Sequence, residues 1–367
     1  MKEVYIGMDV HSKFIYCVVQ DKNGKIVMDG GIDTNTEAIK AFLMEILKAP
    51  AGTQIGLESG QQAVWLSKYL SSLGMSPLVI DAKEVRAKAR RVGQKSDKRD
   101  AFEICDGIRR KIYDSVVYVA DEKTQRLKNI LMRRRHFVNM CTREKNAAKF
   151  LLRANGIKTD KLLLGSEKGW EKLYERIGQK YYVAHAQMHG ELWKLSNKQV
   201  KILEQELEAA LEPFKDIMAV LTSAPCVGPL TAATYIAVIG NPDRFPDSSK
   251  VVSYTGLATA TFNSGDSKRH GRITKRGSSE LRFMLCEAAH AARNPYNPLN
   301  PYFAKVCAKK GYKRAIVAVA HRLSRILYQL WKRKEFFDID KTNLEYGEYI
   351  KVRKTHYRLK SSKVRAG

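Results

Sequence analysis

The sequence VYIGMDVHSKFIYCVVQDKNGKIVMDGG at residues 4–31 contains three consecutive strand patterns. VYIGMDV and FIYCVVQ are runs of apolar and β-branched residues, which are typical of strands. The pair Asn23-Gly24 favours a tight hairpin turn before the third pattern, KIVMDGG. The stretch therefore predicts three antiparallel strands in a row.

The next ninety residues alternate helical and strand patterns. Residues 34–48 have apolar residues at helical spacing, and QIGLES then predicts a strand. A helix at 62–73, a strand at PLVI and a basic helical stretch running past Asp100 follow. Three antiparallel strands followed by helices and strands in alternation is the order of an α/β ribonuclease H-like domain.

The remaining chain predicts helices. Apolar residues recur at helical spacing in 121–155 and 192–211, which predicts paired long, coiled-coil-like helices that form either an ordinary hairpin or a dimerising or spacing arm. The turn at Val227-Gly228 resembles a helix-hairpin-helix element, and 313–334 predicts a basic amphipathic helix. We expect four parts: an α/β domain at 1–120, a long-helix region at 121–216, a mostly α domain at 217–345 and a basic tail at 346–367.

The charge balance indicates a polyanionic partner. The 367 residues carry 65 Lys or Arg against 38 Asp or Glu, which gives a net charge of +27. The excess is concentrated in segments such as 83–99 and 351–367, and such clusters favour nucleic acid over a generally basic protein. Six scattered cysteines, the lack of a long apolar run and the polar N-terminus predict a cytoplasmic protein with reduced thiols and no membrane partner.

Four acids fall where the expected fold brings them together. Asp9 ends the first strand, Glu58 lies near the end of a neighbouring strand, and Asp97 and Asp100 share a helix face. Four hard oxygen donors suit two Mg²⁺ ions, which stabilise a phosphodiester during cleavage. The alternative is surface ion pairing with the neighbouring cations Lys95, Lys98 and Arg99.

Sugar kinases and actin-like ATPases also begin with a strand hairpin that carries an aspartate. Their phosphate-binding hairpin needs small residues, whereas this chain has His11 and Lys13 after Asp9. The sequence therefore disfavours an ATP-binding hairpin.

The stretch NSGDSKRHGRITKRGSSELR at 263–282 predicts a positive loop with Ser264 beside the flexible Gly265. A serine hydroxyl needs a base or a metal for activation and positive charge to stabilise the phosphate it attacks. Ser264 is the candidate nucleophile and Ser267 its rival, and the alternative is that Ser264 caps a turn. Ten cations are the candidates for nucleic-acid binding: Lys83, Arg86, Lys88, Arg90, Arg91, Lys268, Arg269, Arg272, Lys275 and Arg276.

With these motifs in order, the chain resembles the DEDD transposases of bacterial insertion sequences, the IS-one-ten group of bridge-RNA-guided recombinases. KSDKRDA at 95–101, YTGL at 254–257 and SGDS at 264–267 carry the resemblance, which covers about residues 3–120 and 217–335. It implies a RuvC-like domain with Asp9, Glu58, Asp97 and Asp100 as the Mg²⁺ ligands. It also implies Ser264 as a nucleophile that forms a phosphoserine link to DNA.

The resemblance implies partners as well: donor and target DNA, a bridge RNA that selects them, and a dimer or tetramer with composite sites. The chain departs from the family pattern at Ser96, where threonine is common, at Asp266, where a neutral residue is expected, and in the longer segment 121–216. Two other functions stay open, a metal-dependent nuclease or Holliday-junction resolvase without a covalent intermediate, and a non-catalytic nucleic-acid-binding protein.

Overall fold

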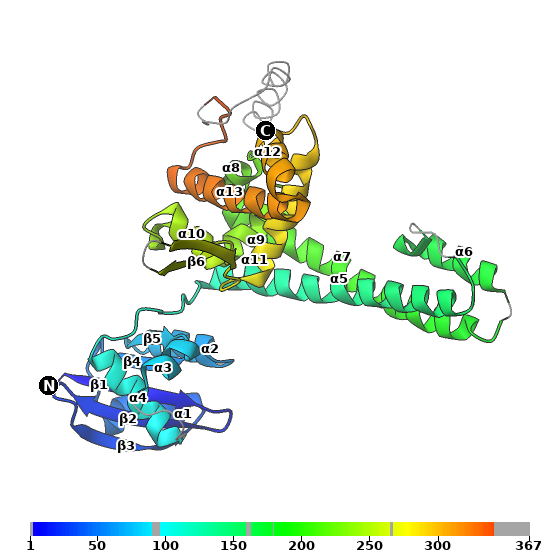
Figure 1. The fold of residues 1–367 in the computed structure, drawn as a ribbon. Helices are drawn as coiled ribbons and strands as arrows, with labels where there is room; N and C mark the ends of the chain where they lie inside the picture. The colour runs from blue at the N-terminus through cyan, green and yellow to red at the C-terminus, as the bar shows by residue number, and fades with distance from the viewer. Residues whose placement is uncertain (1–2, 90–95, 159–162, 179, 265–266, 341–367) are drawn as a thin grey trace. The chain divides into compact units, whose positions relative to one another are not determined.

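The computed structural model describes residues 3–89, 96–158, 163–178, 180–264 and 267–340. Its contacts divide the chain into two compact units, Met1–Ala120 and Asp121–Gly367 (Figure 1). The first is an α/β unit with a mixed sheet, and the second is mostly helical, as the sequence predicts. The finer division at residues 216 and 345 stays a prediction, and the basic tail lies outside the described residues.

The N-terminal unit contains a five-stranded sheet in the order β3-β2-β1-β4-β5. The first three strands pair antiparallel, and β4 and β5 extend the sheet in parallel from β1. This arrangement is consistent with a ribonuclease H-like domain. The strands are β1 (Val4–Val10), β2 (Phe14–Asp21), β3 (Ile26–Asp33), β4 (Gln54–Glu58) and β5 (Ser76–Ile80).

Helices cover both faces of this sheet. Ile6 and Met8 point to one face, where they pack with α1 (Thr36–Lys40), its π-helical continuation η1 (Ala41–Ile46) and α2 (Ala63–Ser72). Tyr5 points to the other face and packs with α3 (Ala82–Lys88) and α4 (Asp97–Arg109). Because side chains alternate along a strand, Asp9 belongs to the α4 side.

The prediction of one basic helix running past Asp100 is wrong. The chain forms two helices, α3 and α4. Ala89 leaves the helical region with φ −60° and ψ 133°, and Ser96 is also extended, with φ −151° and ψ 149°. The helix that carries Asp97 and Asp100 therefore has its own N-terminus.

The C-terminal unit is built around α9, most of whose residues are buried. Two long helices, α5 and α7, lie side by side and extend from this core, with α6 packed against their far end (Figure 1). The helices are α5 (Glu122–Ala154), α6 (Glu167–Ile177), α7 (Val183–Leu211), α8 (Lys215–Thr222), α9 (Pro229–Ile239), α10 (Ser248–Thr255), α11 (Ser279–Ala289), α12 (Asn300–Lys310) and α13 (Tyr312–Arg333). Short 3₁₀ turns are η2 (Leu163–Gly165), η3 (Glu212–Phe214), η4 (Pro242–Arg244) and η5 (His290–Arg293).

One strand pair, β6 (Thr259–Ser264) and β7 (Ser267–Ile273), belongs to this helical unit. The prediction of a loop over the basic stretch after Ser264 is wrong in this respect, because Ser267 to Ile273 form a strand. The threonines and Phe262 in TATFNS favour extended backbone. The prediction of a charged loop did not take this signal into account.

Candidate functional site

The close approach of α4 to β1 positions Asp9. Gly7 lies two residues before Asp9 on the same face of β1, and a Cβ atom there would overlap the carbonyl oxygen of Ala101. Glycine thus allows the helix backbone to lie directly on the strand. The N-terminal end of α4 consequently lies over the end of β1.

Capping fixes that N-terminal end. The Ser96 side chain accepts a hydrogen bond from the backbone N–H of Arg99, and Asp97 and Asp100 both lie in the first turn. A serine cap satisfies one of the free N–H groups of the helix, and its positive end favours carboxylates nearby. The sequence KSDKRDA therefore encodes both the start of the helix and the position of its acids.

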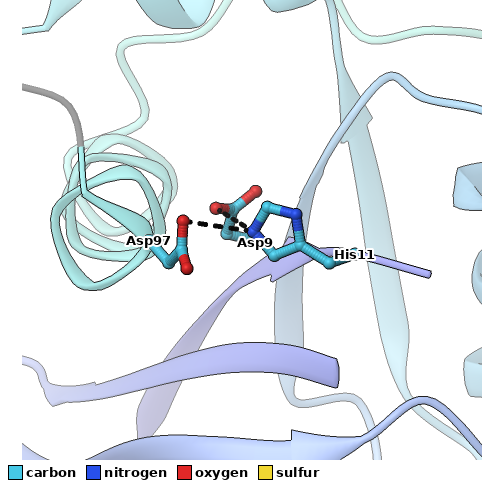
Figure 2. Close-up of side chains that lie close together, drawn as sticks. All are labelled: Asp9, His11 and Asp97. Carbon is cyan, nitrogen blue, oxygen red and sulfur yellow. Dashed lines mark hydrogen bonds and ion pairs between the residues drawn. The ribbon is translucent and has the colours of Figure 1, made fainter. Parts of the chain in front are cut away.

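Asp9, His11 and Asp97 converge at this point (Figure 2). His11 Nε2 lies 3.1 Å from Asp9 Oδ2 and 3.2 Å from Asp97 Oδ1. One ligand atom from each of the three residues lies within 4.8 Å of the others. The imidazole thus bridges a carboxylate from the sheet and one from the helix.

Burial raises the pKa of Asp9, and the nearby carboxylates of Asp100 and Asp97 raise it further. The interaction with His11 opposes this rise. Burial and like-charge crowding both disfavour the ionised carboxylate, so a positive charge at this point is stabilising. The electrostatics match a cation-binding site.

The contacts of His11 with Asp9 and Asp97 were not predicted from the sequence. The sequence analysis used His11 only as an argument against an ATP-binding hairpin. Residues two apart in extended backbone share a face, so the Asp9-x-His11 spacing was an available signal. The contact to Asp97 required the position of α4, which spacing does not give.

Glu58 lies at the end of β4, the strand that pairs in parallel with β1 at Met8↔Leu57. Its Oε1 lies 3.8 Å from Arg86 Nη2. Among the described residues it is not in the group whose ligand atoms lie within 4.8 Å, although it ends the neighbouring strand. The structure thus brings together Asp9 and Asp97, and Asp100 is close enough to affect the pKa of Asp9. Glu58 instead forms an ion pair with Arg86.

The donor set fits a divalent metal ion. Carboxylate oxygens suit Mg²⁺ and Mn²⁺, whereas imidazole suits the later transition metals better than it suits Mg²⁺. Two carboxylates and one imidazole at these distances are compatible with a single ion, with Asp100 as a further oxygen donor nearby.

Three of the predicted nucleic-acid-binding cations lie on α3. Lys83 and Arg86 are exposed, whereas Lys88 is half-buried and forms ion pairs at 2.7 Å with Glu84 and 2.8 Å with Asp114. Lys88 therefore ties α3 to the segment after α4. Arg90 and Arg91 lie outside the described residues.

The backbone places Ser264 at the last position of β6, paired with Ser267 at the first position of β7. Both candidate nucleophiles thus lie next to the connection between the two strands, whose residues Gly265 and Asp266 lie outside the described part of the chain. Lys268 and Arg269 follow in β7, where their backbones pair with Asn263 and Phe262.

The base of this hairpin is held by the YTGL motif. Gly256 ends α10 in the left-handed region at φ 72°, and its carbonyl oxygen accepts a hydrogen bond from the Lys275 N–H. Gly277 has φ 125°, and a Cβ there would overlap the Tyr254 carbonyl oxygen. The predicted nucleic-acid-binding cations Arg272, Lys275 and Arg276 are exposed.

Comparisons with known proteins match both units. A family model described as "Transposase IS116/IS110/IS902 family" matches residues 218–303. A second model, for the DEDD domain of IS110 transposases and described as "Transposase", matches residues 6–155. The chain belongs to the IS116/IS110/IS902 transposase family. The predicted resemblance is therefore confirmed.

Individual relatives of this family include the transposase for insertion sequence element IS1111A of Coxiella burnetii, 30% identical over 36% of this chain and 38% of the relative. An IS110 insertion-element protein of Streptomyces coelicolor is 28% identical over 39% of the chain and 35% of its own length. The chain thus spans little more than a third of these two relatives. The transposase for IS1533 of Leptospira borgpetersenii is 24% identical over 90% of the chain and 96% of the relative.

Within the described residues of this transposase-family chain, no helix combines the length and apolar character needed to cross a membrane.

Proposed function

We propose that this protein is the transposase of an insertion sequence and that it cuts and rejoins DNA. The observation that carries the proposal is the convergence of Asp9 and Asp97 in a chain whose two units match models of one transposase family. The net charge of +27 supports a nucleic-acid substrate.

In this proposal the first unit is RuvC-like and holds divalent cations, with Mg²⁺ the expected ion. Asp9, Asp97 and Asp100 would supply oxygen ligands, with Glu58 as the fourth acid and His11 as an additional nitrogen donor. A bound ion of this kind neutralises the charge that develops on the phosphate oxygens. Asp9 extends from β1, His11 directly follows that strand and Asp97 extends from a packed helix, so the fold itself holds the three side chains close together.

Ser264 is the proposed nucleophile. Its Oγ would form a bond to phosphorus while the bond from phosphorus to a deoxyribose oxygen breaks. The electron pair of that bond leaves with the deoxyribose oxygen, which takes up a proton, and the serine gives up its hydroxyl proton. The phosphoserine link then preserves the phosphodiester energy for rejoining, and cations such as Lys268 and Arg269 would stabilise the charged phosphate.

Further partners follow from the family resemblance. We propose that donor and target DNA are selected by a bridge RNA and that two or four copies of the chain act together. The positive charge supports binding of RNA and DNA phosphates alike.

The test is a search for a covalent protein–DNA adduct. Full-length protein is incubated with labelled DNA carrying the element's ends, its associated RNA and Mg²⁺, and is then denatured. We expect a labelled adduct whose peptide contains Ser264, and we expect Ser264→Ala to abolish it while Ser267→Ala retains it.

Two results would change the assignment. An adduct that survives in Ser264→Ala and disappears in Ser267→Ala would move the nucleophile across the hairpin. DNA cleavage without any adduct, but still dependent on Asp9, would favour a metal-dependent nuclease or junction resolvase instead.

A further inference from the structure

Helix α13 lies outside both segments that the family models match, 6–155 and 218–303. Its 22 residues, YKRAIVAVAHRLSRILYQLWKR, include six Lys or Arg and no Asp or Glu. One face, with Ala315, Val319, Leu323 and Leu327, is buried in the core of the unit. The cations lie on the remaining surface, where no acid of the same helix neutralises them.

Three of these cations line one cavity. Arg322, Arg325 and Arg333 border a space of about 400 Å³ between α13, the start of α10 and the segment that follows α13. At a rise of about 1.5 Å per residue, the three arginines span about 16 Å along the helix. Apolar side chains complete the lining with Ile326, Leu330 and Phe337, and Phe337 is buried.

Two of the guanidinium groups are held in place. Arg325 Nε donates a hydrogen bond of 3.2 Å to Ser248 Oγ, and Ser248 is itself buried. The Arg322 guanidinium carbon lies 4.5 Å from the ring centre of Tyr302. A stacked or hydrogen-bonded arginine loses less conformational freedom when it binds an anion.

The described part of the chain shows no ion pair for Arg322, Arg325 or Arg333. Burial, and then the neighbouring Arg325 charge, lower the pKa of His321. Among the described residues that line the cavity, Glu335 and Asp338 are the acids, so three guanidinium groups and two carboxylates leave one net positive charge. This balance matches the single negative charge of a phosphodiester better than the double charge of free phosphate at neutral pH.

We infer that the cavity beside Arg322 and Arg325 binds a backbone phosphodiester of the nucleic acid on which the protein acts. The guanidinium fork pairs with two phosphate oxygens at once, and the apolar floor lowers the local dielectric around that pair. The inference rests on the proposed function and deepens it, because it gives the substrate backbone a contact on α13, through residues that belong neither to the acid site nor to the serine hairpin.

The experiment measures binding without chemistry. Equilibrium binding of the full chain in EDTA is followed over a series of salt concentrations, with a labelled DNA duplex, a single-stranded RNA and inorganic phosphate as separate probes. The test variant is Arg322→Gln/Arg325→Gln. The control variant is Lys309→Gln/Lys313→Gln, which removes the same charge from exposed positions that do not line the cavity.

We expect the test variant to bind polynucleotide at least about 10-fold more weakly at low salt. The slope of log K against log salt should fall by about 1–2, because each phosphate contact contributes about 0.9 for duplex DNA and about 0.7 for single strands. The control should change the slope by less than about 0.5. The variant Arg325→Lys keeps the positive charge, so its slope of log K against log salt should stay close to the wild-type slope.

Each outcome is decisive. A reduced slope for DNA alone, for RNA alone or for both supports the site and identifies its polymer. The inference is overturned if the control variant changes the slope as much as the test variant does, or if the test variant leaves the slope unchanged. It is also overturned if inorganic phosphate saturates the site without weakening the binding of DNA or RNA. The experiment measures binding and not cleavage. Its result can therefore be interpreted even if the proposed cleavage reaction is wrong.

Discussion

The acid cluster and the serine hairpin are built in different ways. Asp9 and Asp97 are distant in sequence and meet because α4 packs on β1 through Gly7. The β6–β7 hairpin is local, and the segment 254–278 holds its base through backbone hydrogen bonds and two glycines with positive φ. The first site depends on long-range packing and the second on local backbone conformation, so different substitutions should damage them.

The largest effect should come from the acid cluster itself. Asp9→Asn keeps the side-chain shape but removes the charge from the centre of the site. We expect DNA cleavage to fall at least about 100-fold, since metal stabilisation of phosphate charge contributes several kcal/mol. Mn²⁺ binding, followed by electron paramagnetic resonance, should weaken in parallel.

The matched control for Asp9 is Asp33→Asn, an exposed aspartate at the end of β3. It removes the same charge from the same unit and should leave both cleavage and Mn²⁺ affinity unchanged. Equal losses in the two variants would attribute the effect to overall charge rather than to the site.

Gly7→Ala should break the packing that brings the acids together. The new methyl group meets the α4 backbone, which must move, and overpacking of this kind costs about 1–3 kcal/mol. We expect a lower unfolding temperature by calorimetry of the full chain and a weaker Mn²⁺ site. Gly30→Ala in β3 is the control, because a Cβ there meets nothing within 4 Å. If Gly7→Ala leaves Mn²⁺ affinity intact, the packing does not position the acids.

Gly277→Ala tests the hairpin in the same way. At φ 125° an alanine is strained and its Cβ overlaps the Tyr254 carbonyl oxygen, at a cost of about 1–3 kcal/mol. DNA rejoining should fall while Mn²⁺ affinity stays at the wild-type value, which is the opposite of the Gly7→Ala result for the metal. Gly228→Ala, at a glycine with no atom within 4 Å of a Cβ, is the control. A parallel loss of Mn²⁺ affinity would show that the two sites do not fail separately.

This difference also explains what the sequence predicts well. Strands and helices of the first unit follow from periodicity, and the capping serine before Asp97 is a local signal, so the α/β fold and the acids on α4 are predictable. The bridging position of His11 and the Arg86 contact of Glu58 depend on how α3 and α4 pack, which no local pattern specifies. The end of α3 at Lys88 was not predicted, because the residues around it are compatible with a helix. Only the backbone conformation of Ala89 shows that the helix ends there.

In the hairpin the limit is of another kind. The family motif predicts Ser264 as the nucleophile, but the charges around it suggested a loop where Ser267 to Ile273 form a strand. Cross-strand pairing that begins at Ser264↔Ser267 makes the two serines equivalent in backbone position. Spacing alone therefore does not separate them, and the adduct experiment does.

The smallest effect should come from Glu84, which secures α3 beside the acid site. Its carboxylate accepts hydrogen bonds from the backbone N–H groups of Asp114 and Ser115 and pairs with Lys88. Burial alone would raise the pKa of Glu84, but these bonds outweigh it and lower the pKa to about 2. Glu84→Gln should lower the free energy of unfolding by about 1–2 kcal/mol at neutral pH.

The pH dependence gives this prediction its sign. Because the folded pKa is below the value of 4.5 for the free side chain, the folded state binds fewer protons than the unfolded state in this range. The stabilisation by Glu84 is complete above about pH 5 and is lost as the pH falls toward 2. The gap between wild type and Glu84→Gln in urea unfolding should therefore narrow between pH 5 and pH 3. The exposed Glu45→Gln should show no gap at any pH. If the difference in unfolding free energy between wild type and Glu84→Gln stays constant with pH, Glu84 acts through packing. Long-range packing would then be sufficient to hold α3 beside the acids without the charge of Glu84.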